Sequence, residues 1–132
     1  TKGNLIVGIG QAALGANTTA YNNTEVGGDA LGANITGADN NVFGSGALTA
    51  NTTGGDNNAF GKSALAANTT GGANVAMGHV ALDANTTGNS NTALGRAALS
   101  GNTTASNNTA VGYSSLLANT TGRQSVAIGS GA

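Results

Sequence analysis

One pattern of hydrophobic and polar positions returns along the whole chain at every seventeenth residue. The tripeptide Asn-Thr-Thr, written Asn-Ile-Thr in one copy, begins at Asn17 and recurs at this interval without insertion. Counted from this Asn, the unit is N-T-T-G-x-x-N-x-A-φ-G-x-x-A-L-x-A, where φ is bulky and apolar. Residues that share a unit position are called a column below. The copies span residues 1–16, 17–33, 34–50, 51–67, 68–84, 85–101, 102–118 and 119–132.

This period predicts the fold class. A unit of this length is too short for two helices and their turns, and its Asn, Thr and Gly content disfavours helix. We expect extended segments at unit positions 7 to 10 and 13 to 17, with turns at the glycine of position 11 and around N-T-T-G. The sequence therefore predicts an all-β protein, a parallel β-solenoid of about eight coils that forms a single domain over residues 1–132.

The glycine of unit position 11 is present in every copy. A corner directly after a strand often needs positive φ or a close approach of the next coil, and glycine meets either demand without a steric penalty. Replacing Gly61 with Val is accordingly expected to destabilise the fold by several kcal/mol. The predicted corner residues are Gly10, Gly27, Gly44, Gly61, Gly78, Gly95, Gly112 and Gly129.

Two apolar columns are the predicted core. Position 10 keeps its hydrophobicity while its size varies, and position 15 is Leu in every complete copy. Position 10 is therefore expected to point inward, and strand alternation then places position 9 on the outer face. The predicted core residues are Ile9, Val26, Phe43, Phe60, Met77, Leu94, Val111 and Ile128, together with Leu14, Leu31, Leu48, Leu65, Leu82, Leu99 and Leu116.

The outward column at position 9 is then a stripe of small apolar residues. It is Val42, Ala59, Ala76, Ala93, Ala110 and Ala127 in the later coils. The stripe predicts either a subunit interface or simply a small residue tolerated on a tight sheet.

Composition favours the interface. Ala, Gly, Asn and Thr supply 85 of 132 residues, whereas Leu, Ile, Val and Phe together number 23. One coil therefore buries too little apolar surface to offset the ordering of its own backbone and side chains without help from ladders or partner chains. We expect the chain to associate with itself as a homotrimer of parallel chains, or end to end as a filament because no capping element is evident.

Charge and residue types exclude several partners. Four basic residues and a net charge of −1 leave no electrostatic footprint for nucleic acid. No apolar run approaches the roughly 20 residues of a membrane span, so we expect no membrane insertion by this segment. The opening Thr1-Lys2-Gly3 does not have the pattern of a secretion signal, and any such signal is expected outside the segment.

No constellation of catalytic, cofactor-binding or metal-ligating residues is predicted. Residues 8–13, Gly-Ile-Gly-Gln-Ala-Ala, look like a dinucleotide-binding turn, but Gly10 belongs to the glycine column and no βαβ pattern follows. His79, the single histidine, occupies the variable column 12, which is expected to face solvent. The acidic residues occupy several columns, with only Asp39 and Asp56 sharing one, so no calcium ladder is expected.

Two polar columns allow alternative interpretations. The first Asn of each unit is either a ladder of amides bonded between coils or a glycosylation site, because each precedes x-Thr. Asn22 and Asn107 also precede x-Thr. The Thr columns at positions 2 and 3 would suggest ice binding if they formed a flat face. The Asn column is Asn17, Asn34, Asn51, Asn68, Asn85, Asn102 and Asn119.

Residues 91–99, Asn-Thr-Ala-Leu-Gly-Arg-Ala-Ala-Leu, resemble repeats of bacterial surface proteins and phage tail-fibre-like proteins, which often precede an intramolecular chaperone of the endosialidase type. Residues 125–132, Ser-Val-Ala-Ile-Gly-Ser-Gly-Ala, are similar to the head motif of trimeric autotransporter adhesins, whose unit is shorter than that of this chain. The resemblance implies a left-handed β-roll assembled as a trimer and exposed outside a cell or virion.

The expected function is accordingly a non-enzymatic structural or adhesive rod segment of an extracellular fibre, filament or phage-like tail fibre, without a cofactor. A host-surface glycan or protein is a further expected partner. The alternative is a binding module that uses a flat Thr/Asn face to recognise ice or carbohydrate.

Overall fold

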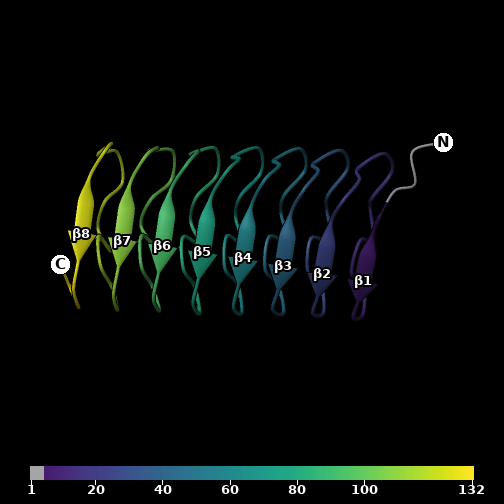
Figure 1. Cartoon of the computed structure of the whole chain (residues 1–132), viewed down its shortest axis with the longest axis horizontal. Helices are drawn as coiled ribbons and strands as arrows, with labels where there is room; N and C mark the ends of the chain where they lie inside the picture. Colours follow the sequence, from purple (N-terminus) through teal and green to yellow (C-terminus); the bar gives the residue numbers. More distant parts are fainter. Residues whose placement is uncertain (1–4) are drawn as a thin grey trace.

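The chain folds as a stack of parallel coils. The computed structural model describes residues 5–132, so the opening Thr1-Lys2-Gly3 lies outside the described residues. Eight short strands pair in parallel and in chain order to form one sheet (Figure 1). They are β1 (Val7–Ile9), β2 (Thr24–Val26), β3 (Asn41–Phe43), β4 (Asn58–Phe60), β5 (Val75–Met77), β6 (Thr92–Leu94), β7 (Thr109–Val111) and β8 (Val126–Ile128).

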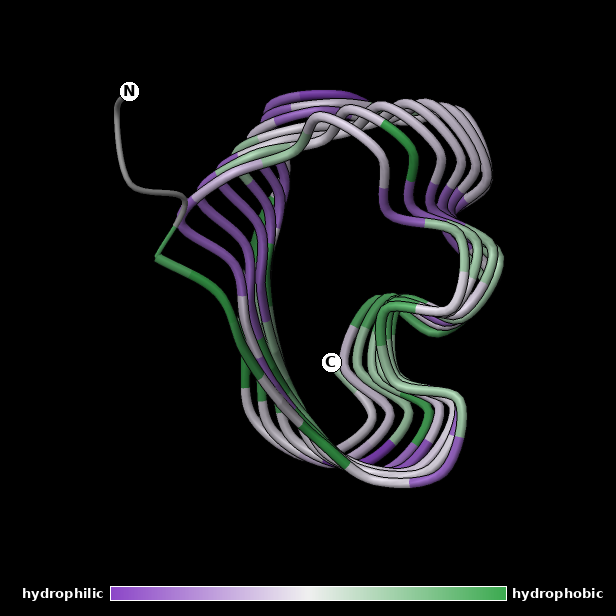
Figure 2. Cartoon of the chain, turned by 90° about the vertical axis from the view of Figure 1, so that its right-hand side faces the viewer, coloured by the Kyte–Doolittle hydropathy of each residue, from purple (hydrophilic) through white to green (hydrophobic). Residues whose placement is uncertain are grey.

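The register equals the sequence period. Each strand residue pairs with its equivalent in the next copy of the unit, as Asn58 does with Val75 and Phe60 with Met77. The coils therefore superpose when the stack is viewed along its axis (Figure 2). The predicted all-β fold, a parallel β-solenoid with one repeat unit per coil, is confirmed.

The glycine corner has the predicted geometry. The eight corner glycines have φ between 128° and 146°, a region that other residues rarely adopt. At Gly61, a Cβ atom would lie 2.6 Å from the carbonyl oxygen of Gly78 in the next coil. Both reasons for glycine, positive φ and close approach of the neighbouring coil, therefore hold at this corner.

The second extended segment predicted at positions 13 to 17 is wrong. This segment is a turn in every complete coil, and positions 13 and 15 have positive φ, as in Ser63 (57°) and Leu65 (55°). Positive φ ends a strand because it turns the backbone out of the pleat. The turn folds Leu65 into the interior, where it is 0% exposed. The free energy gained by burying this side chain offsets the cost of the left-handed backbone conformation, which is about 1–2 kcal/mol.

The predicted assignment of the two strand faces is also wrong. Column 9 points inward: Val42, Ala59, Ala76, Ala93 and Ala110 are each 0% exposed. Column 10 points outward, because Phe43 is 38% and Met77 40% exposed even in the middle of the stack. The column-10 residues predicted as core and found exposed or partly exposed are Ile9, Val26, Phe43, Phe60, Met77, Leu94, Val111 and Ile128.

The physical reason for this inversion is the narrow interior of the coil. The core consists of the Ala/Val column 9, the Ala column 14 and the Leu column 15, which pack as one cluster along the stack. One Leu and two small side chains fill each level, so no room remains for a second bulky residue. The Leu column is confirmed as core, with Leu14 and Leu116 partly buried against the cluster at its two ends.

Candidate functional site

The first Asn of each unit forms a buried hydrogen-bonded ladder. The Nδ2 atom of Asn68 donates to Asn51 Oδ1 in the preceding coil at 2.9 Å and to the Gly71 carbonyl of its own turn at 2.9 Å. Asn85 Nδ2 then donates to Asn68 Oδ1 at 2.9 Å. The same two bonds recur at Asn51 and Asn102. The predicted ladder is confirmed over most of the stack.

A second Asn ladder, in column 7, was missed by the sequence analysis. Asn57 Oδ1 accepts from the backbone N–H of Asn74 at 3.1 Å, and Asn74 Nδ2 donates to the carbonyl of Gly88 at 2.9 Å. Asn occupies this column in six of seven copies between residues 17 and 132. That regularity was the available signal, since an exposed position would not require the same amide in each coil.

The ladder geometry bears on the glycosylation alternative. Both Nδ2 hydrogens of Asn68 are used in hydrogen bonds, and the side chain is 0% exposed. A glycan on this nitrogen would remove a donor and requires space that the folded coil does not have. By contrast, Asn22 and Asn107 are exposed.

The two Thr columns differ in their environments. Four column-2 hydroxyls, those of Thr18, Thr52, Thr69 and Thr86, donate to the backbone of the next coil, as Thr52 Oγ1 does to the Thr69 carbonyl at 3.1 Å. Column-3 residues are exposed in every copy. The column-3 residues are Thr19, Thr36, Thr53, Thr70, Thr87, Thr104 and Thr121.

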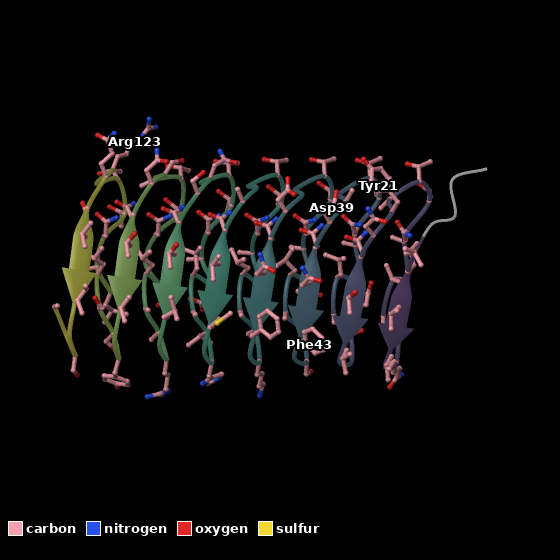
Figure 3. The ribbon with its side chains drawn as sticks, in the orientation of Figure 1. Tyr21, Asp39, Phe43 and Arg123 are labelled. Atoms are coloured by element: carbon pink, nitrogen blue, oxygen red, sulfur yellow. The ribbon has the colours of Figure 1, made fainter. Side chains whose placement is uncertain are left out.

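The outward-facing column 10 forms a row of apolar side chains along the stack, which we call the apolar stripe. Within it, the rings of Phe43 and Phe60 stack with centroids 4.9 Å apart and an interplanar angle of 9°. Phe43 projects at the end of β3, as Figure 3 shows. The stripe comprises Ile9, Val26, Phe43, Phe60, Met77, Leu94, Val111 and Ile128. It extends along all eight strands, far beyond the scattered apolar residues that any surface displays.

Charged residues lie beyond the two ends of the strands that display the stripe. Lys62, His79 and Arg96, in column 12 of three successive coils, are exposed and form the basic corner. The Arg96 guanidinium lies 5.5 Å from the centroid of the Tyr113 ring and donates from Nη1 to Tyr113 Oη at 3.3 Å.

At the other end of the strands, the exposed Asp39 and Asp56 of column 6 form the acidic corner. Figure 3 shows Asp39 beyond the beginning of β3, opposite the end that bears Phe43. Asp39 Oδ1 accepts a hydrogen bond of 3.0 Å from Asn22 Nδ2.

One ionisable side chain lies inside the coil. Glu25 occupies column 9, where other coils have Ala or Val, and it is 0% exposed. Its Oε2 accepts from the backbone N–H of Leu14 at 2.8 Å, while its Oε1 is buried without a partner. Desolvation by burial raises the pKa of Glu25 from 4.5 to about 7, with the Leu14 hydrogen bond opposing the shift.

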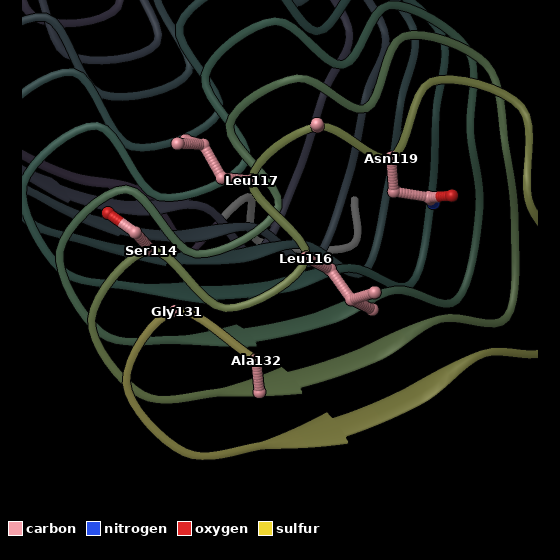
Figure 4. A pocket seen from close by; sticks show the side chains of 7 residues that line it. Ser114, Leu116, Leu117, Asn119, Gly131 and Ala132 are labelled. Carbon is pink, nitrogen blue, oxygen red and sulfur yellow. The ribbon is translucent and has the colours of Figure 1, made fainter.

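A hollow of about 450 Å³ lies at the C-terminal end of the stack (Figure 4). Its lining is mostly apolar and includes Leu116, Leu117 and Ala132. Leu116, which lines the hollow, is the last Leu of column 15 among the described residues. The polar side chains in its lining are Ser114 and Asn119, so the lining contains no base that could activate a nucleophile.

Between residues 5 and 132, no cluster of three or more His, Cys, Asp or Glu side chains could hold a metal ion. The same part of the chain has no helix that could span a membrane. Gly10, in the segment that looks like a dinucleotide-binding turn, is a solenoid corner with φ of 139°. Comparisons of the chain with protein-family models, with curated proteins and with solved structures find no match.

Proposed function

We propose that this chain is a non-enzymatic structural segment of a rod-shaped fibre, in which several copies associate through the apolar stripe. The single observation that supports this function is the stripe itself. It exposes Phe43, Met77 and Ile128 at 38%, 40% and 72% along one face of the stack. Surfaces of this kind mark sites of association in stable proteins.

The interior of the stack suits a mechanical role. Backbone hydrogen bonds connect successive coils on several sides, as between Asn58 N and the Asn74 carbonyl (2.8 Å) and between Leu65 N and the Ala81 carbonyl (3.0 Å). The Asn ladders add side-chain bonds between the same coils. Bending the rod would stretch many of these bonds together, so the stack is expected to be stiff.

A parallel homotrimer is the form of association that we propose. The resemblance of residues 91–99 and 125–132 to repeats of surface and tail-fibre-like proteins and of trimeric adhesins supports a trimer with a location outside a cell or virion. The same resemblance supports a left-handed solenoid. Stacking of copies end to end is a further mode of self-association.

Static light scattering of the purified chain tests the proposal. We expect a mass about three times that of the 12.5 kDa chain at micromolar concentration. Replacing the exposed Met77 with Asp should shift the mass toward that of the monomer, since an unpaired charge would be buried in the interface. A folded wild-type monomer would contradict the proposal. The control is Thr87→Asp, at an exposed position outside the stripe.

A binding module is the second candidate, favoured by the exposed column-3 threonines. They repeat at the spacing of the strands, about 4.8 Å, and present a regular file of hydroxyl groups. A single file can recognise a periodic ligand such as ice or a carbohydrate chain. Measured thermal hysteresis, lost in a Thr53→Val/Thr70→Val variant, would support this candidate over the structural one.

A further inference from the structure

The charges at the two corners indicate how neighbouring chains are oriented. The basic corner (Lys62, His79 and Arg96) follows the end of the strands, and the acidic corner (Asp39 and Asp56) precedes their beginning. Both flank the apolar stripe. In a chain with only 7% charged residues, two clusters of opposite sign on opposite edges of one apolar face are a specific arrangement.

Backbone conformation does not explain the acidic corner. Asp39 and Asp56 have φ of 59° and 61°, and Asp or Asn tolerates this left-handed region better than most residues. Asn22 and Asn107 occupy the same column at 56° and 63° without a charge. The conformation therefore accounts for a short polar side chain at these positions and leaves the negative charge unexplained.

The basic corner has no acidic partner in its own column, where Arg96 instead contacts the ring and hydroxyl of Tyr113. Successive coils place Lys62, His79 and Arg96 about 4.8 Å apart along the stack. Residues of column 12 include no acid. Lys62 and Arg96 carry positive charges two coils apart, and a second chain that supplies carboxylates would give them the acidic partners that their own column lacks.

The two ways of joining apolar stripes differ in which corners meet. When the stacks run in the same direction about a common axis, the strand ends of one chain lie beside the strand beginnings of the next. Basic and acidic corners then abut. When one stack is reversed about an axis along the strands, strand ends lie beside strand ends, and basic corner meets basic corner. Charge complementarity therefore favours stacks that run in the same direction.

The positions of the charged residues along the stack axis agree with this orientation. Asp56 and Lys62 belong to the same coil, and Asp39 lies one coil earlier, about 4.8 Å along the axis. Within one chain, β4 separates Asp56 from Lys62. Between chains at the same level, Lys62 of one would lie within reach of both carboxylates of the next, and His79 would lie one coil above Asp56.

Resting on the proposed trimer, we propose that neighbouring chains run in parallel and meet edge to edge, with Lys62 of one chain facing Asp39 and Asp56 of the next. The apolar stripe supplies the area of contact. The corner charges set the direction of the chains and the edge at which each chain meets its neighbour.

Thiol cross-linking tests this contact directly, because the chain contains no cysteine. In an Asp56→Cys/Lys62→Cys variant, a short bis-maleimide should join chains into a covalent trimer on a denaturing gel, whereas either single variant should remain monomeric there. Ala73 holds φ of 57° in column 6, which shows that this position does not require a charged or branched polar residue. Cross-linking of the Lys62→Cys variant alone would show that basic corners meet and would overturn the proposal.

Charge reversal gives a second measurement that does not depend on thiols. Lys62→Asp should weaken trimer association about tenfold at low salt, and adding Asp39→Lys and Asp56→Lys should restore it. Arg123→Asp, the same reversal outside both corners, is the control and should have little effect. A wild-type trimer that neither cross-links between positions 56 and 62 nor responds to these reversals would overturn the edge pairing and leave the proposed function intact. A wild-type monomer would overturn both.

Discussion

The carboxylate of Glu25 takes the place of a backbone carbonyl for Leu14. In the following coil, the N–H of Leu31 donates to the Ala47 carbonyl at 3.0 Å, and the same bond recurs at each later Leu of column 15. At the first coil, Leu14 N–H instead donates to Glu25 Oε2 at 2.8 Å. Gly8, the column-9 residue of the first coil, pairs with Glu25 in the register of β1 and β2. One of the hydrogen bonds between the first two coils therefore depends on an ionisable group.

This dependence predicts that stability falls as pH rises. The pKa of Glu25 is raised from 4.5 to about 7 in the fold, so the folded chain binds a proton more tightly than the unfolded chain. The contribution is fully present below about pH 4.5 and is lost as pH rises through about 7, by up to about 3 kcal/mol at about 1.4 kcal/mol per pKa unit. Urea unfolding from pH 4.5 to 8 measures it.

The Glu25→Gln variant is the matched control for this pH effect. It keeps the size and an acceptor for the Leu14 N–H but does not ionise, so its stability should vary less between pH 5 and pH 8 than that of the wild type. The expected loss in the wild type should be concentrated in the first coil, where hydrogen exchange of the Leu14 amide reports it. Parallel pH profiles for the two proteins would contradict the assignment of the effect to Glu25.

Much of the fold could be predicted because the repeat constrains it in one dimension. The glycine column, the Leu column and the first Asn column each have one residue type at a fixed interval, and the structure aligns them along the stack. Column 10 is wrongly predicted as core because all its residues are hydrophobic, although their side chains differ widely in size. Column 9 is small in every coil except that of Glu25, as at Ala76, because the interior is narrow. The varied sizes in column 10, from Phe60 to Met77, indicate a surface that tolerates change.

An Ala76→Leu variant tests this face assignment. Ala76 is 0% exposed beside a filled Leu column, so three added carbons should overpack the interior and destabilise the fold by about 1–3 kcal/mol. Thr87→Leu enlarges an exposed residue and should leave the midpoint of thermal unfolding nearly unchanged. Equal midpoints of thermal unfolding for the two variants would mean that the side chains of column 9 point out of the coil, as the sequence pattern predicts.

The remaining differences from expectation come from contacts that neither pattern nor propensity encodes. Leu48 and Leu65 adopt φ of 49° and 55°, which no local preference of Leu favours, and only burial in the finished stack explains it. Glu25 breaks the column-9 pattern, and its bond to Leu14 becomes evident only when two coils are brought together. The shape of the coil in cross-section likewise decides which columns lie at its exposed corners. The period of the sequence does not determine this shape.

The Asn ladder predicts a large effect from a single amide. Asn68→Ala removes its two donated bonds, to Asn51 and Gly71, and leaves one of the two Nδ2 hydrogens of the buried Asn85 without an acceptor. We expect a loss of about 3 kcal/mol, because unsatisfied buried partners remain on both sides. Thr70→Ala, at an exposed position two residues away, is the control. A loss no greater than that of the control in urea unfolding would show that water replaces the ladder bonds.

The corner glycine predicts an effect on both the coil and its neighbour. In Gly61→Ala, the added Cβ would lie 2.6 Å from the Gly78 carbonyl oxygen and 3.2 Å from the His79 nitrogen, at a φ of 137° that disfavours any side chain. A loss of about 3 kcal/mol is expected, and Gly61→Val should lose at least as much. The matched control is Gly15→Ala, whose Cβ would meet Ala12 and Gly32 oxygens at 3.5 Å, an ordinary contact. Thermal unfolding that gave the two Ala variants the same midpoint would mean that neighbouring coils separate at this corner at little cost.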